Sequence, residues 1–230
     1  MQPLSKSFKG FSPESPRFLF KVRENNSKTW FEQNKHIYQR YLLEPFKNLV
    51  HDLTDTMLDI DPGFEVRPVI NRTISKIYRD TRFSRDKSLF KSTMWLTFKR
   101  PSKEWKNAPA FYFEMTASDY RFGMGYYEAS SNTMAAFRKS IDTAPAKFLK
   151  AISFYTPSNP FRIEGPVYKR PIRNDHPQQI QVWYQRKSFY LASNHEINEL
   201  LFSSHFVDTI ASGFTMLKPL YWYLMNLKTE

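Results

Sequence analysis

Six basic and two acidic side chains, interleaved with aromatic rings, lie between Lys76 and Lys91, a stretch named here the basic segment. Arginine guanidinium groups bind carboxylate or phosphate through two parallel hydrogen bonds, and neighbouring carboxylates can hold such groups in position. Two aspartates cannot neutralise six cations. A buried segment of this composition therefore needs another acceptor, either a carboxylate elsewhere in the chain or an external anion.

The chemistry of the basic segment predicts a binding site for a ligand that carries phosphate or carboxylate. Five of its side chains are the expected ligand-binding residues: Arg79, Asp80, Arg82, Asp86 and Lys87. The alternative is an internal ion-pair network that fixes the path of the chain, because buried arginines are normally paired. Since Phe83 and Phe90 should turn their rings into the core, we expect Arg82 and Asp80 in or beside a partly buried polar cluster.

A second candidate is the pair Gly123 and Gly125, in a chain that contains only 6 glycines. A glycine loop that leads into a helix N-terminus can present backbone N–H groups to an anion. A bulge or a sheet corner is the alternative, because a lone Gly-x-Gly lacks the third glycine of a dinucleotide site. We expect both glycines to complete the ligand site, with Arg79 or Arg82, and not Lys91, approaching them.

The sequence assigns no catalytic residue, metal or cofactor. With no cysteine, thiolate metal sites, disulfides and cysteine nucleophiles are excluded, and the 5 histidines lack the spacing of metal ligands. Hydrolase signatures such as Gly-x-Ser-x-Gly and the Walker loop are absent. The run Asp175-His176-Pro177 could supply an acid–base pair, but a helix start capped by Asp175 is the preferred interpretation. Whether the protein is an enzyme stays open.

The net charge of the chain indicates which classes of binding partner are favoured. The chain has 34 lysines and arginines against 22 aspartates and glutamates, a net charge of +12, which favours polyanionic partners. Because the basic residues are spread along the chain, a nucleic-acid-binding module is the alternative and not the preferred function, with a purely structural interaction protein as a third possibility. No stretch approaches the length of a membrane span and no signal-peptide core is present, so we expect a cytoplasmic protein with no membrane partner.

The apolar and aromatic fractions, 41% and 17%, are sufficient for a folded core, and no linker divides the chain, so residues 1–230 are expected to form one domain. Apolar residues alternate in three stretches, 94–98, 111–115 and 120–124, which predicts an antiparallel meander. A strand over 74–78 is also predicted, from a less regular alternation. The section from Pro157 to Pro177 reads as irregular.

Helical spacing of apolar residues precedes and follows this meander. A first helix should be capped by Ser12 with Pro13 at its first position, and a second, capped by Asn26 or Ser27, should break at Pro45. Later helices are predicted from Ser130 or Ser131, after Pro145, around 180–183, and over 206–224 with a bend at Pro219. Helices, then a sheet, then helices indicate an α+β fold, an antiparallel sheet packed against N- and C-terminal helices.

Motifs spread over nearly the whole chain resemble a bacterial family known as domain of unknown function 2461. They are Asn25-Asn26 with Trp30-Phe31, Arg79 to Ser84 with Asp86-Lys87, Gly123 and Gly125 with Arg138 and Ile141, Tyr168 to Pro171, and Asp175 to Pro177. The chain departs from the family pattern at Lys76, usually arginine, at Leu89-Phe90, commonly Pro-Tyr, at Met124, which interrupts a glycine run, and at Ala129, commonly proline. The resemblance implies a single domain and marks the basic segment as the family signature, but it implies no activity.

Overall fold

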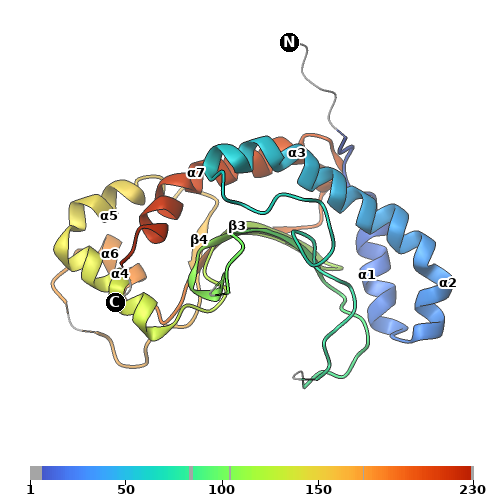
Figure 1. The fold of residues 1–230 in the computed structure, drawn as a ribbon, viewed down its shortest axis with the longest axis horizontal. Coiled ribbons are helices and arrows are strands. Elements are labelled where there is room, and N and C mark those ends of the chain that lie inside the picture. The colour runs from blue at the N-terminus through green and yellow to red at the C-terminus, as the bar shows by residue number, and fades with distance from the viewer. Residues whose placement is uncertain (1–6, 83–84, 104, 173, 229–230) are drawn as a thin grey trace, which may run out of the picture. The chain divides into compact units, whose positions relative to one another are not determined.

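The computed structural model describes residues 7–82, 85–103, 105–172 and 174–228 (Figure 1). Within them, five strands form an open antiparallel sheet in the order β1-β2-β3-β5-β4, and helices precede and follow it in the chain. The α+β prediction is therefore confirmed. The strands are β1 Met94–Phe98, β2 Ala110–Met115, β3 Asp119–Gly125, β4 Arg162–Glu164 and β5 Tyr190–Glu196. The helices are α1 Glu14–Glu24, α2 Lys28–Tyr38, α3 Glu44–Ile60, α4 Ser131–Thr143, α5 Pro145–Ala151, α6 Gln178–Tyr184 and α7 Phe206–Met225.

The predicted meander corresponds to β1, β2 and β3, in which every second side chain of β1 and β2 is buried. Two predictions about strands were wrong. The stretch 74–78 makes only isolated bridges, Ile74 with Ile70 and with Leu96, and Tyr78 with Phe90, because its backbone bonds go to three different segments. The section expected to be irregular contains β4, which pairs with β5 in the register Ile163 to Leu191.

The chain divides into two compact units. Unit 1 holds the residues up to Phe98 together with Tyr112–Arg121 and His195–Ser212. Unit 2 holds Lys99–Phe111, Phe122–Asn194 and the chain from Gly213 onward. Strands β2, β3 and β5 and helix α7 contribute residues to both units. The prediction that residues 1–230 form one domain stays a prediction.

Of the two helix caps predicted for unit 1, one is confirmed and one was wrong. Helix α2 begins after Ser27, whose Oγ accepts a hydrogen bond from the Trp30 N–H at 3.2 Å, as predicted. Helix α1 begins after Pro13 and has no side-chain cap, so the predicted Ser12 cap was wrong. Ser12 instead donates its backbone N–H to Ser15 Oγ.

The predicted break at Pro45 takes the form of a π-helical stretch, Gln39–Leu43, between α2 and α3. Pro45 lies in the first turn of α3 and cannot donate to the Tyr41 carbonyl, which accepts a hydrogen bond from the Ser15 hydroxyl of α1 instead. The break therefore divides one long helix into two without a loop.

The end of the basic segment is anchored in the core of unit 1. The Phe90 ring is buried and stacks on Phe31, with the ring centroids 4.3 Å apart. The side chain of Asn26 pairs with the Phe90 backbone in both directions, donating from Nδ2 to the carbonyl at 2.9 Å and accepting from the N–H at 3.0 Å. It also donates to the Val22 carbonyl of α1 at 3.1 Å. One amide side chain thus joins the end of α1 to the basic segment.

Replacing Asn26 should therefore destabilise the protein. Asn26→Ala leaves the partly buried backbone groups of Phe90 without their partner, and we expect a loss of about 1–3 kcal/mol in the free energy of unfolding, measured by urea denaturation. The matched control is Asn25→Ala, which removes one exposed bond, from Nδ2 to the Lys21 carbonyl. Equal losses in the two variants would contradict this role for Asn26.

Candidate functional site

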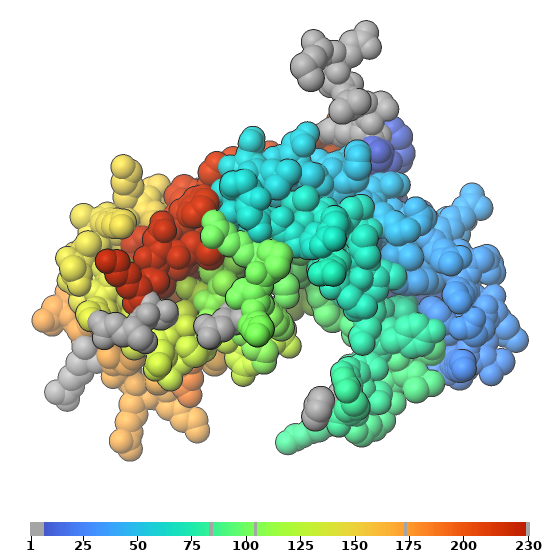
Figure 2. Space-filling view, viewed as in Figure 1, coloured from blue at the N-terminus to red at the C-terminus, as the bar shows by residue number. Residues whose placement is uncertain are grey.

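The basic segment folds back on itself as a hairpin within unit 1. The Arg79 N–H donates to the Leu89 carbonyl and the Lys91 N–H donates to the Ile77 carbonyl, each at 2.8 Å. Figure 2 shows this hairpin, in teal to green, protruding from the surface of unit 1. The prediction that Phe83 turns into the core falls outside the described residues. The hairpin brings together five of the predicted site residues: Arg79, Asp80, Arg82, Asp86 and Lys87.

Arg82 and Asp80 form a surface ion pair and not the partly buried cluster that the sequence predicted. Arg82 donates from Nε and Nη2 to the two carboxylate oxygens of Asp80, at 3.0 and 2.8 Å, while its side chain is 75% exposed. These hydrogen bonds, with a smaller contribution from Lys76, hold the pKa of Asp80 well below its usual range. The prediction failed because a spacing of two residues lets the arginine fold back onto the aspartate in solvent.

Arg82→Ala should consequently leave the thermal unfolding temperature unchanged, because exposed ion pairs contribute little to stability. Arg79→Ala should lower that temperature by about 2–4 °C, since the Arg79 side chain is only 25% exposed and holds two parts of the hairpin together. Differential scanning calorimetry of both variants tests the contrast. A larger effect from Arg82 than from Arg79 would contradict it.

The other predicted residues of the basic segment, Arg79, Asp86 and Lys87, contact one another or the backbone of the hairpin. Arg79 contacts Asp86 through Nη2 at 2.9 Å and Ser88 Oγ through Nε at 3.0 Å. Asp86 also accepts the Ser88 N–H at 2.9 Å, which lowers its pKa, and Lys87 donates to the Thr81 carbonyl at 2.7 Å. Both aspartates are thus occupied by cations of the same hairpin, so the internal ion-pair network describes this part of the segment.

Three cations of the segment form neither an ion pair nor a side-chain hydrogen bond among the described residues: Lys76, Arg85 and Lys91. Lys91 is half-buried, and its Nζ lies 4.1 Å from the centroid of the Trp95 ring. Its pKa is lowered to about 8, first because burial disfavours the charged form and then because Lys76 and Arg79 are near. Sequence reasoning had set Lys91 aside, although the excess of cations over aspartates was the signal for an unpaired one.

This shift of the Lys91 pKa predicts a pH dependence of stability. Between about 8 and the ordinary value of 10.5 the folded chain binds fewer protons at Lys91 than the unfolded chain, so the free energy of unfolding rises with pH in that window. The difference in unfolding free energy between wild type and Lys91→Met should therefore shift in favour of wild type from pH 7.5 to 10. Lys147→Met, at an exposed lysine of α5, is the control and should give a flat difference. A flat difference for Lys91→Met as well would contradict the pKa shift.

The sequence analysis placed Gly123 and Gly125 in a loop before a helix. That prediction was wrong, because both glycines lie in strand β3. A Cβ on Gly123 would overlap the Leu191 carbonyl oxygen of β5, and one on Gly125 would overlap the Cα of Tyr190. Neither glycine has a positive φ. The close approach of β5 therefore explains both glycines. They belong to unit 2, and their participation in a ligand site with the basic segment stays a prediction.

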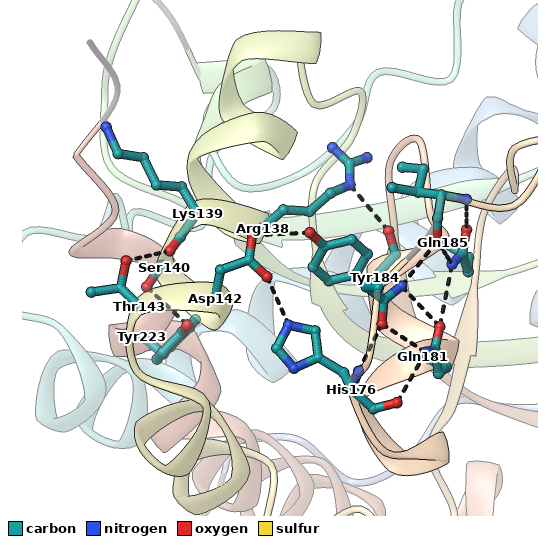
Figure 3. A network of polar contacts seen from close by, with 12 residues as sticks. Arg138, Lys139, Ser140, Asp142, Thr143, His176, Gln181, Tyr184, Gln185 and Tyr223 are labelled. Atoms are coloured by element: carbon teal, nitrogen blue, oxygen red, sulfur yellow. Dashed lines mark hydrogen bonds and ion pairs between the residues drawn. The ribbon is translucent and has the colours of Figure 1, made fainter.

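A second polar network, in unit 2, contains His176 (Figure 3). His176 Nε2 lies 2.7 Å from Asp142 Oδ1, and the Tyr184 hydroxyl donates to Asp142 Oδ2 at 3.0 Å. Burial and this bond to a carboxylate raise the pKa of Tyr184. The predicted Asp175 cap was wrong: Pro177 precedes α6 and no side chain caps it. The acidic partner of His176 therefore comes from α4 and not from its neighbour in the sequence.

Arg138 explains one of the positions on which the family resemblance rested. Its guanidinium donates to three backbone carbonyls, those of Met134, Tyr184 and Arg186, at 2.9, 3.1 and 3.0 Å. It also lies 5.2 Å from the centroid of the Tyr168 ring. The arginine thus holds α4 against the end of α6, and together with the contacts of Asp142 it indicates that the network of Figure 3 positions these elements.

The described part of the chain has neither a metal-binding cluster nor a membrane-spanning helix. No three or more histidine, aspartate or glutamate side chains there are placed to hold a metal ion. None of the helices in that part of the chain has both the length and the apolar character needed to cross a membrane.

The chain was also compared with known proteins. A family model described as "Conserved hypothetical protein (DUF2461)" matches residues 14–223, a range that includes the basic segment, both β3 glycines and Arg138. No curated protein matches the chain. The resemblance drawn from the motifs is confirmed.

Proposed function

We propose an anion-binding function for this chain, which belongs to the DUF2461 family of conserved hypothetical proteins. The ligand carries phosphate or carboxylate and binds at Lys76, Arg79 and Lys91, named here the cation triad. The observation that carries the proposal is the half-buried ammonium group of Lys91, next to two other cations and without a carboxylate contact among the described residues.

Electrostatics supports an external anion at this place. Like charges close together in a partly desolvated site repel one another, and a bound anion would turn that repulsion into attraction. The two aspartates of the hairpin compensate this positive charge only in part, because Asp86 pairs with Arg79, while Asp80 pairs with Arg82 and interacts only weakly with Lys76. The guanidinium group of Arg79 has three nitrogens. Nε and Nη2 contact Ser88 and Asp86, whereas Nη1 has no partner among the described residues and remains available as a donor.

The other predicted site residues have supporting roles in this proposal. Asp86 holds Arg79 in place, and Lys87 closes the hairpin through the Thr81 carbonyl. Gly123 and Gly125 are not required. A cytoplasmic location is part of the proposal, supported by the absence of cysteine, which is typical of proteins in reducing compartments.

The test is calorimetric titration of the protein with inorganic phosphate and with citrate at low salt. Phosphate should bind to the wild type, and Lys91→Met and Arg79→Gln should each weaken it about tenfold, which corresponds to about 1.4 kcal/mol. Lys147→Met removes the same charge from an exposed position of α5 and should leave the affinity unchanged. The same affinity in all four proteins, or no binding to the wild type, would refute the proposal.

A titration with a single-stranded oligonucleotide distinguishes a nucleic-acid-binding module from a site for a small anionic ligand. A complex whose affinity falls steeply with salt, and which Lys91→Met and Arg79→Gln weaken but Lys147→Met does not, would favour that alternative over a small ligand.

A further inference from the structure

We propose that Lys91 is a carbonyl-reactive amine, whose Nζ condenses with the aldehyde or keto group of an anionic carbonyl compound to form an imine. The substrate class is a 2-oxo acid or a phosphorylated aldehyde, in which the carbonyl carbon lies a few bonds from the negative group. This inference rests on the proposed anion-binding function and narrows its ligand.

The position of the Lys91 amine is defined by contacts at both ends of the residue. Its backbone N–H is bonded to the Ile77 carbonyl, and the preceding residue, Phe90, is held in the core by Asn26 and Phe31. At the other end the Nζ lies over the Trp95 ring. A lysine fixed in this way presents its nitrogen at one place instead of sampling the solvent.

The surroundings of the amine favour its neutral, nucleophilic form. Two cations, Lys76 and Arg79, are close, and no carboxylate of the described residues contacts Lys91. A lysine that is partly desolvated next to another cation loses its proton more easily, which is how amine nucleophiles are activated. The lowered pKa gives Lys91 a larger neutral fraction at pH 7 than an ordinary lysine has.

The condensation needs no oxidant or reductant. The nitrogen lone pair forms a bond to the carbonyl carbon, the carbonyl π electrons move to oxygen, and a proton passes from nitrogen to that oxygen to give a carbinolamine. Loss of water then forms the C=N bond. Amine and carbonyl thus yield imine and water, while the negative group of the substrate contacts Arg79 and Lys76.

Lys99 provides an internal comparison. It is also half-buried and its Nζ also lies over an aromatic ring, 3.7 Å from the centroid of Trp105, but only burial lowers its pKa. Lys99 therefore reproduces the desolvation and the ring contact of Lys91 without the neighbouring cations. Lys147, exposed on α5, represents an ordinary lysine.

The experiment traps the imine. The full-length protein is incubated with pyridoxal 5′-phosphate, an anionic aldehyde, then reduced with sodium borohydride, and the modified lysines are identified by peptide mass spectrometry. A parallel reaction uses pyridoxal, which lacks the phosphate. Lys91 should be modified at least about tenfold faster than Lys99 and Lys147 with the phosphorylated probe, and inorganic phosphate should slow the reaction.

Two variants locate the effect. Lys91→Arg keeps the positive charge but removes the primary amine that forms the imine, so it should lose the modification at this position. Arg79→Gln should slow the reaction with pyridoxal 5′-phosphate more than the reaction with pyridoxal. Circular dichroism establishes that each variant is folded before labelling.

Each contrary outcome has a distinct meaning. Modification of Lys91 no faster than that of Lys147, in a protein that binds phosphate, would refute the reactive amine and leave the anion site intact. Equal rates at Lys91 and Lys99 would refute the role of the cation triad in the reaction. Absence of both modification and phosphate binding would refute the proposed function together with this inference.

Discussion

The attachment of Phe90 to the core of unit 1 is the constraint on which the candidate site depends. The Phe31 ring stacks on its side chain, and the amide of Asn26 binds its backbone in both directions. Because Lys91 follows directly, its backbone is fixed against Ile77 and its amine is held over Trp95. A site in a surface hairpin would otherwise lack a defined geometry, since exposed ion pairs order a loop only weakly.

Charge within the hairpin is distributed unevenly, and this distribution separates the supporting residues from the proposed binding residues. Arg82 and Asp80 neutralise each other in solvent, while Arg79 is shared between Asp86 and the cation triad. Four cations of the segment have no ion pair among the described residues: Lys76, Arg85, Lys87 and Lys91. A structural network and a binding site therefore coexist in one segment, and Arg79 belongs to both.

In unit 2 the same kinds of residue serve packing. Gly123 and Gly125 allow the backbone of β5 to approach β3, and the guanidinium of Arg138 is bonded to three backbone carbonyls. His176 has a carboxylate partner, but Asp142 comes from α4, which makes the pair a link between elements. Residues that suggest chemistry by their type thus have structural explanations here, whereas Lys91, which the sequence analysis set aside, is the residue proposed as the reactive amine.

Local patterns in the sequence were sufficient for the meander, for a helix cap at Asn26 or Ser27 and for a break near Pro45, because each depends on neighbouring residues and on a period of two or 3.6. The excess of cations in the basic segment is also a property of the sequence alone. Which cation stays unpaired was decided by the tertiary structure. Asp80 takes the arginine two residues away and Asp86 takes Arg79 across the hairpin, while the bond of Lys91 to Ile77 sets it among cations. The contacts of Arg79 with Asp86 and of Lys91 with Ile77 depend on the register of the hairpin, and the distant contacts of Phe90 with Asn26 and Phe31, which no local spacing encodes, set that register.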